Sequence, residues 1–168
     1  MSRAVVMEKE QERKIAKRIV KAVALELIPF GFKQTKPTFV CREYPFVVGF
    51  FHFHKFTFGP YFRIHFGIRV LNNEFPAPAL NGPSYEHAGE YGEDERSIEK
   101  CIKKMSTICI KDGVSWFGKW SDAHQLLNDS RSPLRESDKA KLEEGINGRQ
   151  DLRCVSESLK MLGIKPKD

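Results

Sequence analysis

Three histidines lie in a stretch of alternating apolar and polar residues, and their spacing suits chemistry better than any other pattern in this sequence. His52 and His54 are two residues apart, which places both imidazoles on one face of a β-strand. A four-residue loop at 57–60 would return the chain antiparallel, so that His65 lies opposite His52. Three imidazoles on one face are a donor set for a catalytic zinc with one open position. A His-ligated metal enzyme is therefore one alternative.

Two arginines share this predicted face and change its chemistry. The register pairs Arg63 with His54, and Arg69 follows on the same strand. Their charges repel a metal cation, and these segments supply no carboxylate to orient a metal-bound imidazole, so we predict no metal and no cofactor. With Phe50 as a stacking surface, the same groups could hold phosphate or a nucleic-acid strand. The candidate binding residues are His52, His54, Arg63, His65, Arg69 and Phe50.

No nucleic-acid motif, phosphate-binding glycine loop or paired nucleophile and base accompanies these residues. The chain has 28 Lys and Arg against 22 Asp and Glu, a formal net charge of +6, which permits an acidic partner without requiring one. We predict a small non-enzymatic domain that binds an unknown protein partner, with no catalytic residue. Weak binding of nucleic acid or of a phosphate ligand is the first alternative, and enzymatic activity stays open.

The strand pair that would position these residues is a long apolar hairpin at 46–71. Its second arm alternates strictly from Tyr61 to Leu71, the pattern of a strand with one buried face. A slip of one residue would bury His52 and His54, which the hydrophobic pattern disfavours. Phe50 would cover Gly67 across the ladder. The predicted inner pairs are Phe53–Ile64, Phe51–Phe66, Gly49–Ile68 and Val47–Val70.

A third strand is expected at 37–42, before the hairpin. We place Cys41 opposite Val47 and Phe39 over Gly49, so that Phe39 and Cys41 join the buried face. One such face needs a helical cover.

Along the chain, helices are predicted both before and after the segments that form the sheet. The first, at about 4–28, has an apolar stripe and a basic back. An irregular stretch at 72–92 precedes a second helix at 94–111, which Gly113 should end. A last helix at 149–162 should be capped by Gly163 and bury its leucines and valine: Leu152, Val155, Leu159 and Leu162.

These elements predict an α+β fold: an N-terminal helix packed on an antiparallel β-meander of three or more strands, followed by several C-terminal helices. Its 168 residues suit a single domain, 1–168, with a helix and sheet at 1–71, a long loop at 72–93 and a helical part at 94–168. The four scattered cysteines are expected to be free thiols. No signal peptide or membrane-spanning run is recognisable, so we expect a cytoplasmic protein without membrane contact.

Several short stretches together resemble an uncharacterised bacterial family, domain of unknown function 4304. They are Pro29–Phe32, Thr38–Phe39, Val48–His52, His65–Ile68, Gly113–Asp122 and Leu162–Ile164. The family often has glutamine at the position of His52 and asparagine at that of His65. The resemblance thus implies the fold and a bacterial origin but no activity. Whether the C-terminal helices cover the histidine and arginine side chains would decide if a site exists there.

Overall fold

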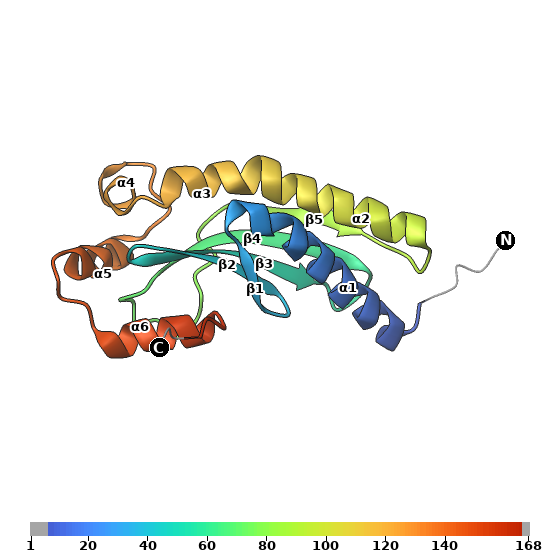
Figure 1. Cartoon of the computed structure of the whole chain (residues 1–168), viewed down its shortest axis with the longest axis horizontal. Coiled ribbons are helices and arrows are strands. Elements are labelled where there is room, and N and C mark those ends of the chain that lie inside the picture. The colour runs from blue at the N-terminus through green and yellow to red at the C-terminus, as the bar shows by residue number, and fades with distance from the viewer. Residues whose placement is uncertain (1–6, 166–168) are drawn as a thin grey trace.

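The computed structural model describes residues 7–165 as an α+β fold in which helices lie on both faces of one antiparallel sheet (Figure 1). This confirms the predicted fold class. Helix α1 (Lys9–Leu27) and a 3-10 turn (Ile28–Phe30) lead into five strands in the order β1-β2-β3-β4-β5. The strands are β1 (Lys33–Lys36), β2 (Phe39–Tyr44), β3 (Val47–Lys55), β4 (Tyr61–Val70) and β5 (Ser84–Glu90). The helices that follow are α2 (Glu95–Ile108), a π-helical turn (Cys109–Gly113), α3 (Val114–Trp120), α4 (Ala123–Asn128), α5 (Glu136–Ile146) and α6 (Leu152–Met161).

The central hairpin of β3 and β4 has the predicted register. Its loop closes with a hydrogen bond of 3.0 Å from the Phe56 amide to the Tyr61 carbonyl, and His52 lies opposite His65. Phe50 covers Gly67 so closely that a Cβ there would lie 2.3 Å from its ring. The inner pairs are Val47–Val70, Gly49–Ile68, Phe51–Phe66 and Phe53–Ile64.

The predicted register of β2 is wrong by three residues. Tyr44, not Cys41, lies opposite Val47, because β2 continues to Tyr44 and the chain reverses at Pro45 and Phe46, the latter with φ of +68°. An odd shift moves every side chain to the other face of the sheet.

That shift exchanges the residues which β2 contributes to the two faces. Cys41 now lies opposite Phe50, and Phe39 opposite His52, so neither joins the inner face. Val40 takes that place, fully buried and opposite Phe51.

The inner face of the sheet is covered by α1, α2 and α3, and the main core lies between them. Phe51 is at its centre, with the rings of Phe32, Phe66 and Phe117 at centroid distances of 5.0–5.2 Å. The apolar stripe of α1 is buried as predicted, whereas the lysines on its back are exposed: Lys14, Lys17 and Lys21. The basic side of α1 is thus a solvent-facing surface.

Two predictions about the segments around α2 are wrong. The stretch 72–92 is not irregular throughout, because β5 lies within it and pairs with β4 through a bulge between Phe62 and Ile64. Gly113 does not end a helix, since the chain continues through the π turn into α3. A Cβ on Gly113 would lie 2.4 Å from the Phe51 ring, so this glycine allows close packing.

Candidate functional site

The outer face of the sheet is divided into a covered half and an open half. Figure 1 shows α6 on the side of the sheet opposite to α2 and α3. Beneath α6 lies a second, small apolar core, fully or almost fully buried, that consists of Cys41, Val48, Phe50 and Leu162. Phe50, predicted as a stacking surface for a ligand, is therefore enclosed by protein.

The end of α6 holds it against β1 and β2. Thr35 Oγ1 donates a hydrogen bond of 2.5 Å to the Leu162 carbonyl. Gly163 has φ of +73°, and the Ile164 amide donates to the Leu159 carbonyl at 2.9 Å, which is the helix cap expected from the sequence. Leu152, predicted to be buried, is 79% exposed at the other end of the helix.

Arg69 lies in the covered half and is only 2% exposed. Its Nε donates to Ser158 Oγ at 3.0 Å, while its terminal nitrogens donate to the carbonyls of Ala77 at 3.1 Å and Asn73 at 2.8 Å. Because these acceptors belong to α6 and to the loop after β4, Arg69 ties both to the sheet. The structure thus places Arg69 and Phe50 in the covered half, apart from the three predicted histidines and Arg63.

The open half contains the remaining four predicted residues, and we call it the histidine face: Phe39, His52, His54, Phe56, Arg63, His65, Ser84 and Glu86. His54 is exposed, and His52, Arg63 and His65 are half-buried. β2 and β5 extend the row of His52 and His65 across the sheet, because Phe39 lies opposite His52 and Ser84 opposite His65. The contributions of β2 and β5 were missed, since the register of β2 was wrong and β5 was not predicted.

Stacked rings form the surface of this face. The His52 ring centroid lies 4.7 Å from that of Phe39 and 6.0 Å from that of His65, with an angle of 20° between the two imidazoles. The Arg63 guanidinium lies over the Phe56 ring at 4.9 Å and contacts Glu86 at 3.3 Å. The arrangement offers flat π surfaces with nitrogen donors and acceptors between them.

The face carries little net charge at neutral pH. Burial lowers the pKa of His52 to about 4, with further contributions from His65 and His54. The pKa of His65 is also lowered, by burial first and then by the Arg63 charge and by His54, although Glu86 opposes this shift. Both imidazoles are therefore neutral at pH 7, and Glu86 balances the charge of Arg63.

Two polar atoms of this face are buried without a hydrogen-bond partner among residues 7–165. They are His52 Nδ1 and Arg63 Nε. Within the same range only Glu12 Oε1 and Ser106 Oγ share this property, and Glu12 Oε1 contacts the ammonium group of Lys55. An unpaired buried polar atom carries a free-energy penalty, so its occurrence twice on one face needs an explanation.

The three histidines do not form a metal-binding group. The imidazoles of His52 and His65 stack, and the ring centroids of His52 and His54 lie 6.2 Å apart. In a zinc site, by contrast, one nitrogen of each imidazole points at the metal ion from about 2.0–2.1 Å. Over the described residues, no cluster of three or more His, Cys, Asp or Glu could hold a metal ion. The same part of the chain contains no helix of the length and apolarity needed to cross a membrane.

Comparison with known proteins yields no match to any protein-family model, curated protein or solved structure. The resemblance to domain of unknown function 4304, and with it a bacterial origin, stays a prediction.

Proposed function

We propose that the protein is a small, non-enzymatic binding domain that binds a protein partner through the histidine face. The two unpaired polar atoms, His52 Nδ1 and Arg63 Nε, carry this proposal. A small rotation of either side chain would bring its nitrogen to a partner's donor or acceptor, which would remove the penalty of burial without a hydrogen bond. The half-buried rings of Phe39 and Phe56 beside them supply apolar contact area for such an interface.

The charge of the face favours a protein over a nucleic acid. A nucleic-acid strand is bound mainly by unpaired cations that replace its counterions. Here His52 and His65 are neutral at pH 7, and Arg63 already contacts Glu86. A polypeptide, with neutral backbone groups and side chains of both signs, complements this surface better.

The chemistry of the surroundings supports a binding role over catalysis. Cys41 lies on β2, two residues after Phe39 of the histidine face and opposite Phe50. Burial raises its pKa to about 11, so it stays protonated and is a poor nucleophile. The carboxylate of Glu86 is exposed and paired with Arg63, which makes it a weak general base.

Parallel selections test the proposal. A display library of random peptides and a pool of random single-stranded oligonucleotides are selected on the immobilised protein at physiological salt. We expect peptides whose affinity falls at least about tenfold in His65→Ala, as for a central interface residue. The matched control is His124→Ala, an exposed histidine on α4, which should not change the affinity.

Two outcomes would reject the proposal. Selected peptides that bind wild type, His65→Ala and Arg63→Ala equally would place the interface elsewhere. Oligonucleotides with sub-micromolar affinity at physiological salt, weakened by Arg63→Ala, would show that the histidine face binds nucleic acid.

A further inference from the structure

Arg69, near the end of β4 and outside the histidine face, carries a buried charge that has no anionic partner among the described residues. Arg69 is 2% exposed, and its guanidinium is charged at neutral pH, as arginine is in proteins generally. Among residues 7–165, no carboxylate oxygen lies within 4.0 Å of its nitrogens. Its acceptors are a hydroxyl and two backbone carbonyls, all neutral. A buried ion is normally paired with an opposite charge, because dipoles alone compensate its lost hydration poorly.

Arg69 also has unused donors. A guanidinium carries five N–H groups, and three of them bind Ser158, Ala77 and Asn73. One N–H on each terminal nitrogen therefore has no acceptor among residues 7–165. Burial lowers the pKa of Arg69, and the Asp138 charge opposes this only in part, so the site still favours an additional anion.

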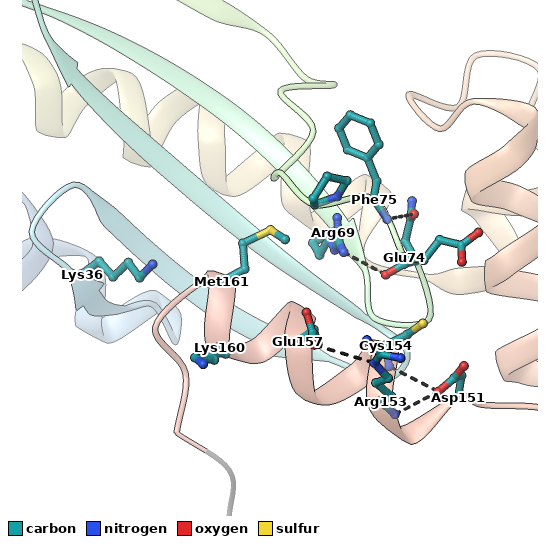
Figure 2. Close-up of a pocket in the computed structure, with 12 residues that line it drawn as sticks. Lys36, Arg69, Glu74, Phe75, Asp151, Arg153, Cys154, Glu157, Lys160 and Met161 are labelled. Atoms are coloured by element: carbon teal, nitrogen blue, oxygen red, sulfur yellow. Dashed lines mark hydrogen bonds and ion pairs between the residues drawn. The ribbon is translucent and has the colours of Figure 1, made fainter.

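Arg69 lines a pocket of about 680 Å³ between α6 and the loop after β4. Figure 2 shows Arg69 between two walls, Glu74 and Phe75 on the loop side and Met161 and Glu157 on α6. Phe75 is 56% exposed, so an aromatic surface and the Met161 side chain border the pocket. A volume of several hundred Å³ suits a small organic ligand.

The charged side chains that line the pocket sum to one net positive charge, from four cations and three carboxylates: Lys36, Arg69, Arg153 and Lys160 against Glu74, Asp151 and Glu157. Arg153 contacts Glu157 at 3.9 Å, and Asp151 caps α6 by accepting from backbone amides. Lys36 and Lys160 also line the pocket, and neither forms an ion pair within residues 7–165. Glu74 also lines the pocket without an ion pair in this range, so the two lysines and Arg69 outnumber the lining carboxylates that lack a cationic partner, Glu74 and Asp151.

We propose that this pocket binds a small molecule through a carboxylate or phosphate group held by Arg69, with Lys160 and Lys36 at the rim and the rest of the ligand against Phe75 and Met161. Arginine binds both oxyanions with paired, charge-assisted hydrogen bonds. The hydrogen bonds to α6 and the loop explain the position of Arg69. They do not explain a full charge there, since a neutral donor could tie the same elements. An anionic ligand explains both.

This site is separate from the histidine face and does not depend on the proposed partner binding. α6 and the small core with Phe50 lie between Arg69 and the open half. His65→Ala should leave anion binding in the pocket unchanged, and Lys160→Glu should leave peptide binding unchanged, so failure of either proposal can be recognised separately.

Nuclear magnetic resonance can test the pocket directly, because the Arg69 Nε–H group gives its own signal in a ¹H–¹⁵N spectrum. Inorganic phosphate and hexanoate are titrated separately, each against sodium chloride of equal ionic strength. We expect saturable shifts of the Arg69 Nε–H signal and of α6 amides with at least one of the two, and the stronger one identifies the preferred oxyanion. Shifts no larger than those with chloride, for both compounds, would overturn the proposal.

Variants distinguish a built site from general attraction to a basic protein. Lys160→Glu, an exposed position that folding should tolerate, should weaken binding roughly fivefold. Lys103→Glu on α2 is the matched control, exposed on the other side of the sheet, and should have no effect. Arg69→Met should abolish binding, with its fold checked by circular dichroism. Equal effects of Lys160→Glu and Lys103→Glu would refute the site even if Arg69→Met did not fold.

Discussion

Acid should destabilise this protein through His52, and replacing that histidine should remove the effect. Its pKa falls from 6.5 to about 4 in the folded state because the ring is buried and has His65 and His54 as neighbours. Between these two values the unfolded chain binds a proton that the folded protein does not. Stability is therefore complete above pH 6.5 and decreases as the pH falls towards 4.

The size of the loss follows from the same values. One pKa unit corresponds to 1.36 kcal/mol, so a decrease to about 4 corresponds to roughly 3 kcal/mol. The ring is only half-buried, and solvent reduces the penalty, so we expect a measured loss of about 2 kcal/mol. His52→Gln keeps a polar, planar side chain without a charge in this pH range.

Urea unfolding at pH 7.0, 5.5 and 4.5 measures the effect. Carboxylates with lowered pKa values, such as Asp94 and Asp151, titrate in both proteins, so the informative quantity is the difference between wild type and His52→Gln. That difference should shift in favour of His52→Gln by about 2 kcal/mol between pH 7.0 and 4.5. His124→Gln should follow wild type. Parallel curves for all three proteins would refute the assignment of a buried neutral imidazole to His52.

Three further predictions concern the core, the sheet and the charge of the protein. Phe66→Ala should cost about 3–5 kcal/mol in urea unfolding, because the ring is fully buried and its loss leaves a cavity; a loss below about 1 kcal/mol would contradict the inner face. Gly67→Ala should cost about 1–3 kcal/mol, since the new methyl group would overlap the Phe50 ring, and a neutral effect in the same assay would contradict that contact. Mixed oligonucleotides should bind only weakly at physiological salt in a fluorescence titration, with an affinity that falls steeply as salt rises; binding that resists salt would contradict an interaction with the exposed lysines of α1.

The hairpin could be predicted because two independent signals agree there. The alternation along β4 fixes which residues face inward, and Gly59 and Pro60 mark the loop. β2 lacked the second signal. Its turn places Phe46 at φ of +68°. Glycine and asparagine adopt this conformation far more often than phenylalanine does, so the sequence carries no mark of the turn. Without that mark the turn was placed too early, and Phe39 and Cys41 were assigned to the wrong face.

β1 and β5 escaped prediction because their patterns carry little apolar signal. β1 is Lys33–Lys36, four polar residues on a sheet edge. β5 buries only small residues, Ala88 and Gly89, and a bulge interrupts its pairing. A Cβ on Gly89 would lie 2.6 Å from the Cys101 sulfur, so close packing against α2 requires glycine where the pattern of a strand calls for a larger side chain.

For the candidate site, the sequence predicted which side chains share a face of the strand, but not which of them another element covers. Alternation placed Arg63 and Arg69 on the same face of β4, which is what the structure shows. It could not reveal that α6 covers one and leaves the other open, because the apolar residues of α6 indicate a buried helix without indicating which face of the sheet it covers. The open arginine is balanced by Glu86, on a strand that was not predicted.

A buried charge in a protein normally has an ion-pair partner, whereas a charge at the surface needs none. The two arginines show the opposite arrangement. Half-buried Arg63 has a carboxylate partner and lies beside neutral imidazoles, whereas buried Arg69 has only neutral acceptors among the described residues. Solvent screens an exposed ion pair, so Glu86 contributes little to stability but keeps the face neutral. A buried cation gains far more from an anion. We therefore propose different ligands for the two ends of one strand face: a polypeptide at the open end and a small oxyanion at the covered end.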